Sequence, residues 1–301
     1  MSSAPRNDRK PVTLTKLHEM RALGEPIVMV TAYDHPSAVV VEQAGVDVVL
    51  VGDSAANNVL GYDDTVPVTI EELLMLSAAV RRGLSTPLLV GDMPFGSYEV
   101  SNEEAIRAAQ RFVKEAGCDA VKLERGGTSV ERTRAIAASG IPVMGHVGLT
   151  PQTATALGGY RSQGRTAERA LEVLHDAVAL QEAGCFAIVF EAIPSALTEV
   201  IMPRLHVPVI GIGAGPTTDG QVLVFHDLLG IYDGHAGRFV KRYADIRRQM
   251  ISGVGGYVAD VRARRYPEPE HGYTMAPDEI ERLHGLLEGS AGEPFTGGFT
   301  L

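Results

Sequence analysis

The sequence is poor in cysteine and has no apolar run long enough to cross a membrane. Its two cysteines, Cys118 and Cys185, exclude the multiple disulfides that hold small secreted domains together. The first residues, MSSAPRNDRKPVTLTK, contain no apolar core of a signal peptide. From these absences we expect a cytoplasmic protein with no membrane partner.

Basic charge is also scarce. Lys and Arg number 27 against 37 Asp and Glu, which gives a net charge of −10 and a pI near 5.4. No block of basic residues is long enough to follow a nucleic-acid backbone, so nucleic acid is not expected as a partner. The 301 residues are 45% hydrophobic and 21% charged, which is ordinary for a globular enzyme.

A repeat of short apolar runs and helical segments fills most of the chain. Apolar strands that alternate with helices imply a parallel sheet covered on both faces, and eight such units predict a single (β/α)₈ TIM barrel. Glycines end several of the helical segments, as C-caps do: Gly45, Gly83, Gly117, Gly140 and Gly184. The runs span 26–34, 46–54, 86–94, 118–126, 141–148, 185–194, 207–215 and, more briefly, 238–243.

A doubly wound open sheet is the alternative fold, although its dinucleotide-binding version is weakened because no GxGxxG follows the first run. Residues 12–24 predict an additional helix before the first strand, placed to cap the barrel floor. The catalytic barrel domain is expected to span 1–272. Residues 273–301 are expected to form a partly flexible extension, with one helix over 277–288 and loose final residues.

Polar side chains gather where the predicted strands end. In a barrel, the carboxyl ends of the strands meet at one mouth, and that mouth carries the chemistry. These positions are far apart in sequence, so their convergence on one mouth is more informative than any single residue. They are Tyr33, Asp34, Asp53, Ser54, Asp92, Lys122, Glu124, His146, Glu191 and the glycines at 211, 213 and 215.

Several acids in one mouth would repel each other unless a cation holds some of them. Asp53, Asp92 and Glu124 supply hard oxygen ligands without a His/Cys set, so Mg²⁺ fits better than Zn²⁺. Such an ion would keep positions open for a 2-oxo acid and would stabilise an enolate. Lys122 and Ser54 would then neutralise and hydrogen-bond the carboxylate of the substrate.

Glu191 is the candidate base. It follows an apolar strand, and burial there would raise its pKa toward the working range. His146 fits a substrate contact and a structural histidine almost equally well. Lys122 and Glu124 point the same way along one strand and would also fit a simple ion pair.

Structural interpretations also compete at the other positions. Asp34 fits a helix N-cap as well as a site residue. GIGAG at 211–215 fits phosphate binding and tight packing equally well. Cys118 and Cys185 each begin a strand and are expected to be small core residues.

Nine motifs, in order along about residues 12–272, resemble those of the ketopantoate hydroxymethyltransferase family. They are VTAYDHPSA, VGDSAANNVLGYDDTVPVT, GDMPFGSYE, AVKLERGG, GIPVMGHVGLTPQ, LGGYRSQGR, FEAIP, IGIGAGPTTDGQVLV and RFVKRYAD. The resemblance implies a barrel of the phosphoenolpyruvate/pyruvate superfamily, dependence on Mg²⁺, and a homodecamer of two stacked five-membered rings.

The resemblance also implies residue roles. Asp53, Asp92 and Glu124 match the metal ligands, and Asp53, Ser54, Asp92 and Lys122 match the substrate contacts. Glu191 matches the general base, and His146 matches an active-site histidine. The implied reaction transfers a hydroxymethyl group from the co-substrate 5,10-methylenetetrahydrofolate to 3-methyl-2-oxobutanoate. It gives 2-dehydropantoate and is the first committed step of pantothenate synthesis.

The chain departs from the family pattern at a few positions. SAANNV stands where many members have SLGMVV, which places Asn58 near the site, and KLERGG carries the additional Arg125. These differences keep two alternatives open. One is a folate-independent C–C lyase or aldolase acting on another 2-oxo acid, and the other is a non-catalytic barrel that binds a ligand. The second predicts loss of a metal acid or of Glu191, and all are present.

Overall fold

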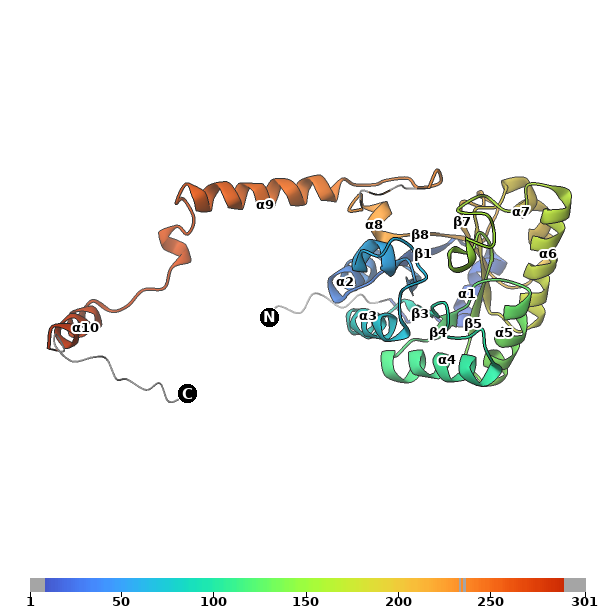
Figure 1. Ribbon diagram of the computed structural model, residues 1–301, viewed down its shortest axis with the longest axis horizontal. Helices are drawn as coiled ribbons and strands as arrows, with labels where there is room; N and C mark the ends of the chain where they lie inside the picture. Colours follow the sequence, from blue (N-terminus) through green and yellow to red (C-terminus); the bar gives the residue numbers. More distant parts are fainter. Residues whose placement is uncertain (1–8, 233, 235–236, 290–301) are drawn as a thin grey trace. The chain divides into compact units, whose positions relative to one another are not determined.

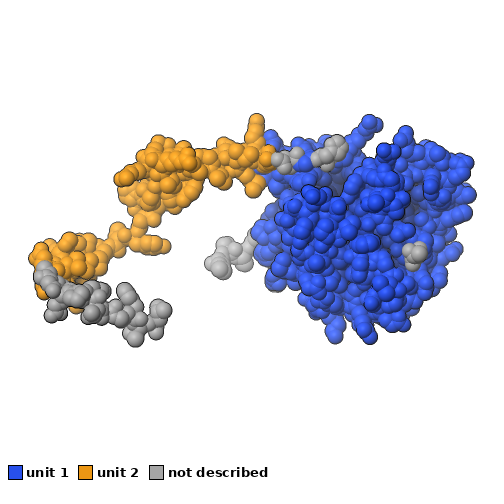
Figure 2. Space-filling view, viewed as in Figure 1, with its two compact units in different colours: residues 1–246 blue, residues 247–301 orange. Residues whose placement is uncertain are grey.

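The computed structural model describes residues 9–232, 234 and 237–289. The chain divides into two compact units, Met1–Ile246 and Arg247–Leu301, coloured blue and orange in Figure 2. The first unit holds every strand that the structure describes. This division rests on contacts within the chain, and the expected domain boundary at residue 272 stays a prediction.

Eight parallel strands close into a barrel in the order of the sequence, and β8 pairs with β1 (Figure 1). The predicted (β/α)₈ barrel is therefore confirmed, and the open sheet is wrong. The strands are β1 (Ile27–Thr31), β2 (Val48–Val51), β3 (Leu88–Asp92), β4 (Ala120–Lys122), β5 (Val143–Gly148), β6 (Ala187–Glu191), β7 (Val209–Ile212) and β8 (Gly220–Leu223).

Helices follow most of the strands and surround the barrel (Figure 1). They are α2 (His35–Ala44), α3 (Ile70–Gly83), α4 (Asn102–Ala116), α5 (Thr128–Ala138), α6 (Ala167–Glu182), α7 (Ser195–Ile201) and the short α8 (Phe225–Leu228). A π-helix, η1 (Ala56–Leu60), and two 3₁₀ turns, η2 (Pro151–Thr153) and η3 (Met202–Arg204), lie in the connections.

The strands bury side chains on both faces, as their continuous apolar runs predict. In β2, Val48 and Leu50 belong to the cluster inside the barrel, whereas Val49 and Val51 belong to the cluster between the sheet and the helices. This alternation is the period of two of an extended chain. With both faces buried, the strands hold the residues at their carboxyl ends in fixed positions.

Helix α1 (Leu14–Leu23) covers the floor of the barrel, as the sequence predicts. Thr13 caps its first turn by accepting a hydrogen bond from the backbone N–H of Lys16. Leu17 and Met20 are buried in the same cluster as the interior residues of the strands. Near the end of the helix, Arg21 forms an ion pair with Asp219, which directly precedes β8.

The eighth strand is not the predicted one. β8 is Gly220–Leu223, within a segment that the sequence pattern assigned to a helix, and residues 238–243 have no regular secondary structure. A Cβ atom on Gly220 would lie 2.3 Å from the carbonyl oxygen of Ile27, so glycine permits the close pairing with β1. Residues 238–243 carry the exposed side chains of Arg238 and Lys241, which a strand buried on both faces could not hold.

One of the predicted glycine caps is also wrong. Gly45, Gly117, Gly140 and Gly184 have the positive φ angles expected at helix ends, but Gly83 has not, and it lies inside the last turn of α3. A Cβ atom there would meet Cβ of Ala38 at 2.7 Å. Gly83 is therefore the last residue of α3 and permits close packing against α2, and the C-cap is Leu84.

The second unit contains helix α9 (Ile246–Arg262), which begins at the last residue of the first unit, a 3₁₀ turn, η4 (Pro269–His271), and helix α10 (Pro277–Gly289). The predicted helix over 277–288 is confirmed, and the predicted loose end lies outside the described residues. None of the residues described between 247 and 289 is buried. Across the described parts of both units, no helix has the length and apolar character needed to span a membrane.

Candidate active site

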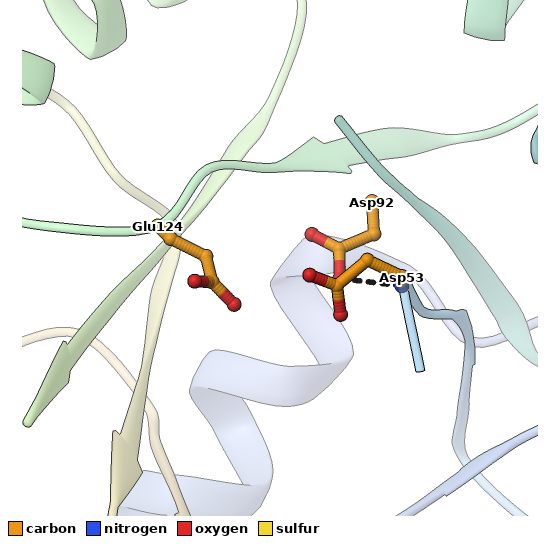
Figure 3. A group of neighbouring side chains, drawn as sticks. All are labelled: Asp53, Asp92 and Glu124. Carbon is orange, nitrogen blue, oxygen red and sulfur yellow. Dashed lines mark hydrogen bonds between the residues drawn. The ribbon is translucent and has the colours of Figure 1, made fainter. Parts of the chain in front are cut away.

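Three acids from neighbouring strands meet at the carboxyl end of the barrel. Asp53 follows β2, Asp92 is the last residue of β3, and Glu124 lies two residues beyond β4. Each offers a carboxylate oxygen within 4.8 Å of those of the other two, and Figure 3 shows the three side chains converging. All three are at least 95% buried. The backbone N–H of Asp53 donates to Oδ2 of Asp92 at 3.1 Å and so links the ends of β2 and β3.

Lys122 provides the ammonium group in this cluster. Its Nζ lies 2.7 Å from both oxygens of Asp92 and 3.4 Å from Oε1 of Glu124. Burial opposes the charge on Lys122, but the carboxylates of Asp92 and Glu124 outweigh it and raise its pKa above the ordinary value. Lys122 therefore pairs with Glu124, as the ion-pair interpretation expects, but Asp92 is its closer partner.

The charges of the cluster do not balance at Asp53. Burial, together with the carboxylates of Glu124 and Asp92, raises the pKa of Asp53 well above its usual range. Its Oδ2 is buried and has no hydrogen-bond partner among the described residues. For Glu124, burial is outweighed by Lys122 and His146, and its pKa falls to about 2. Three carboxylates with one oxygen unpartnered form a donor set that suits a divalent cation such as Mg²⁺.

His146 lies between two carboxylates. Its Nδ1 is 3.2 Å from Oε1 of Glu124, and its Nε2 is 3.2 Å from Oε2 of Glu191. Burial lowers the pKa of His146, but the two carboxylates raise it more, to about 9. An imidazolium here would connect the acid cluster with Glu191.

Glu191 ends β6 and is the least enclosed of these acids. Its side chain is 17% exposed, whereas that of Glu124 is 1% exposed. Its carboxylate is therefore held on one side by His146 and open to the mouth on the other. A group in this position can accept a proton from a bound molecule.

Ser54 lies beside the acids and is oriented by Tyr33. The two hydroxyl oxygens are 2.8 Å apart, and Tyr33 is buried just beyond β1. The neighbouring Asp34 caps α2 by accepting from the backbone N–H of Ser37 at 2.7 Å. The N-cap interpretation of Asp34 is thus confirmed, and Tyr33 is the residue of this pair that contacts the site.

The glycines after β7 are explained by packing. A Cβ atom on Gly213 would lie 2.7 Å from the ring of Phe239, and one on Gly215 would lie 2.4 Å from Oγ of Ser195. The phosphate interpretation of 211–215 has no such support. The cysteines are buried core residues, as predicted, and burial raises the pKa of each thiol to about 12.

The segment that departs from the family pattern forms the π-helix η1, directly after Ser54. The side-chain amide of Asn58 donates to the backbone carbonyl of Ser54 at 2.9 Å. Its Oδ1 is buried and has no partner in the described part of the chain. Asn58 therefore lies near the site, as predicted, and braces the turn that carries Ser54.

Two site residues were not predicted, Tyr98 and Gln152. The backbone N–H of Gln152 donates to Oε2 of Glu124 at 3.0 Å, and the hydroxyl of Tyr98 donates to Oε1 of Gln152 at 2.7 Å. Both side chains are buried. Gln152 ends the motif GLTPQ and Tyr98 lies in GDMPFGSYE, but neither is at a strand end, which was the signal used.

Known proteins resemble the chain over most of its length. The profile described as ketopantoate hydroxymethyltransferase matches residues 11–269. The 3-methyl-2-oxobutanoate hydroxymethyltransferase of Carboxydothermus hydrogenoformans is 50% identical, covering 91% of this chain and 99% of the relative. The protein of the same name from Geobacillus kaustophilus is 48% identical, with the same coverage of both chains.

Solved structures show the same fold at much lower identity. A phosphonopyruvate hydrolase, solved with oxalate and Mg²⁺, superposes with a TM-score of 0.57 at 14% identity, covering 92% of this chain and 96% of the other. A 2,3-dimethylmalate lyase of the PEP mutase/isocitrate lyase superfamily gives 0.53 at 17% identity with the same coverage. These likenesses support the barrel architecture.

Proposed function

Because the chain belongs to the ketopantoate hydroxymethyltransferase family, we propose that its buried acid cluster binds Mg²⁺ and that its co-substrate is 5,10-methylenetetrahydrofolate. The chain is an enzyme that transfers a hydroxymethyl group to 3-methyl-2-oxobutanoate, in the pathway to pantothenate. Relatives half identical over nine-tenths of the chain support this activity against the lyase and the binding-protein alternatives.

The observation that carries the metal proposal is the convergence of Asp53, Asp92 and Glu124, with one oxygen of Asp53 unpartnered. These residues would hold the ion. When bound, Mg²⁺ supplies Lewis-acid stabilisation for negative charge that develops at the keto oxygen of the substrate. Without a cation, burial and the neighbouring carboxylates favour protonation of Asp53, which is the direction of its pKa shift.

Substrate binding is assigned to polar groups that border the acids. Ser54, oriented by Tyr33, would donate its hydroxyl to the carboxylate of the oxo acid. Lys122 would supply positive charge to the same group, while its contacts with both oxygens of Asp92 hold the ammonium in place. These assignments place the substrate between the strand ends of β2 and β4.

Glu191 is proposed as the base that removes the proton from C3 of the substrate. Its side chain is the most exposed in the cluster, and its Oε2 lies 3.2 Å from Nε2 of His146. His146 would then stabilise the base before the proton moves and would fix its orientation. The positive charge of His146 itself depends on Glu124, so the base and the acid cluster are coupled.

The carbanion formed at C3 would bond to the one-carbon unit of the folate. Both C–N bonds of that carbon would break, and water would supply the hydroxyl oxygen of the product. The proton from C3 and one from the water would end on the two nitrogens of the departing tetrahydrofolate. The mouth of the barrel is the proposed place for the folate. The homodecamer and the cytoplasmic location stay predictions, from the resemblance and the composition respectively.

Product formation tests the proposal. The purified enzyme would be given 3-methyl-2-oxobutanoate and 5,10-methylenetetrahydrofolate, and the mixture followed by ¹H NMR. We expect 2-dehydropantoate to accumulate with Mg²⁺ and to stop forming after EDTA, with recovery when Mg²⁺ is restored. Equal rates with and without EDTA would contradict the metal assignment. Turnover with free formaldehyde but none with the folate would contradict the co-substrate.

A further inference from the structure

A buried hydrogen bond joins two polar side chains next to the acid cluster, those of Tyr98 and Gln152. Tyr98 belongs to the loop after β3, and Gln152 belongs to the 3₁₀ turn η2 after β5. The hydroxyl of Tyr98 donates to Oε1 of Gln152 at 2.7 Å. Tyr98 is 3% exposed and Gln152 is 4% exposed, so water does not compete for this bond. The bond therefore holds two active-site loops together.

Gln152 contacts one proposed metal ligand and the residue next to another. Its backbone N–H donates to Oε2 of Glu124 at 3.0 Å. Its side-chain Nε2 donates at 3.0 Å to the carbonyl oxygen of Met93, the residue that directly follows Asp92. One residue thus braces the carboxylate of Glu124 and the strand end that carries Asp92.

The orientation of Glu124 depends on this contact. Oε1 of Glu124 faces Lys122 and His146, whereas Oε2 accepts from Gln152. If this N–H were displaced, Lys122 and His146 on one oxygen would be free to turn the carboxylate of Glu124 toward themselves. Groups that hydrogen-bond a ligating carboxylate typically fix its position, and losing one costs about 10–100-fold in metal affinity or activity.

We propose that Tyr98 and Gln152 are positioning residues that hold Glu124 and Asp92 in a geometry suited to Mg²⁺. Gln152 acts on both acids through its backbone and side-chain N–H groups. Tyr98 acts through Gln152, by fixing the direction of its side-chain amide. The inference rests on the proposed metal site and adds two residues that do not themselves bind the ion.

The chain offers matched variants for a test. Tyr98→Phe removes only the hydroxyl. Gln152→Leu removes the side-chain amide, with its bonds to Tyr98 and to the carbonyl of Met93, at similar volume and keeps the backbone N–H that faces Glu124. Tyr62→Phe is the control, because Tyr62 also donates its hydroxyl to one acceptor, Oε1 of Glu72, at 2.8 Å and away from the acids. The readout is the dissociation constant of Mg²⁺ alone, measured by calorimetry on the metal-free protein, alongside the melting temperature.

We expect Tyr98→Phe and Gln152→Leu each to weaken Mg²⁺ binding by about 10-fold or more. The double variant should bind about as weakly as Gln152→Leu, because the hydroxyl of Tyr98 donates to the side-chain amide that Gln152→Leu already removes. Tyr62→Phe should bind as the parent does. This combination would not follow from a general loss of stability.

Unchanged Mg²⁺ affinity in Tyr98→Phe and Gln152→Leu, even with a lower melting temperature, would overturn the inference. Additive losses in the double variant would overturn the route through Gln152. Tyr98→Phe is nearly isosteric and keeps the test open if Gln152→Leu does not fold. A parent protein that binds no Mg²⁺ would overturn the proposed metal site and this inference together, which distinguishes the two failures.

Discussion

The two ends of the barrel are both buried, but with opposite chemistry. At the amino ends of the strands, Leu17 and Met20 of α1 join the interior apolar cluster. At the carboxyl ends, the buried side chains of Asp53, Asp92, Lys122, Glu124 and His146 carry charge or can acquire it. Burying apolar surface stabilises a fold, whereas burying charge costs free energy unless the charges are paired.

This difference means that one end of the barrel, the floor, serves stability and the other end, the mouth, serves chemistry. The floor is mainly apolar, and the charges near it are paired: Arg21 meets Asp219 with side chains 24% and 15% exposed, and Arg9 meets Asp47 with side chains 33% and 11% exposed. The mouth keeps a costly arrangement of charges that can act on a substrate. Substitutions at the floor should therefore affect stability alone, and substitutions at the mouth should affect activity and, in part, stability.

The largest effect is expected from Asp92→Ala. This change removes a proposed metal ligand and leaves the buried ammonium of Lys122 without its closest partner. Activity should be lost, and the free energy of unfolding should fall by roughly 3–5 kcal/mol, as it does when one member of a buried pair is removed. Urea unfolding followed by circular dichroism measures this.

The matched control for Asp92→Ala is Glu172→Ala, which breaks an exposed ion pair with Arg169. Exposed pairs contribute about 0–1 kcal/mol, so this variant should retain full activity and nearly full stability. An Asp92→Ala protein as stable as the control would mean that the buried pair at the mouth carries no special cost.

At the floor, Leu17→Ala should lower the free energy of unfolding by about 2–5 kcal/mol through the cavity it leaves. Leu17 is 1% exposed and lies far from the acids in the barrel, so kcat and KM should not change. Leu23→Ala in the same helix is the control, since Leu23 is 72% exposed and its loss should cost roughly 0.5 kcal/mol or less. A change in KM for Leu17→Ala would show that the two ends are coupled.

A smaller effect is expected from pH, because the burial cost and the charge attraction at His146 oppose each other. The pKa of His146 is about 9 in the folded protein and about 6.5 when unfolded. Its contribution to stability is therefore complete below about pH 6.5 and is lost as pH rises through about 9. The free energy of unfolding of the metal-free protein should fall across this window.

His146→Gln isolates this contribution from other titrating groups. The fall in stability between about pH 6.5 and 9 should be shallower in the variant than in the parent, because Gln cannot gain or lose the proton. Parallel pH profiles would show that His146 is neutral in the folded protein and does not bridge Glu124 and Glu191 as an imidazolium.

Much of the barrel could be predicted from the sequence because seven of its strands read as short apolar runs, each followed by a helical pattern. The eighth could not, because Gly220–Leu223 is short and runs directly into the helical pattern of α8. What identifies β8 is its pairing with β1 and β7, a contact between distant segments that no local pattern records.

The site residues were predictable in the same way, where a local pattern marked them and not where only the folded chain brings them together. Asp53, Asp92, Lys122, Glu124 and Glu191 lie at or just after strand ends, and His146 lies two residues before the end of β5, so the barrel rule brings them together. Tyr98 and Gln152 lie in loops, where their positions depend on the folded path of the chain. The role of Gln152 toward Glu124 uses its backbone N–H, which every non-proline residue has, so its identity gave no signal.

Hydrogen exchange at C3 of 3-methyl-2-oxobutanoate tests most directly the claim that the mouth performs enolisation with Glu191 as base. The substrate would be incubated in D₂O with Mg²⁺ and without folate, and loss of the C3 proton signal followed by NMR. We predict exchange with the parent protein and a rate about 10²–10⁴-fold lower with Glu191→Gln. An equal rate in Glu191→Gln would contradict the claim, because another group would then be removing the proton.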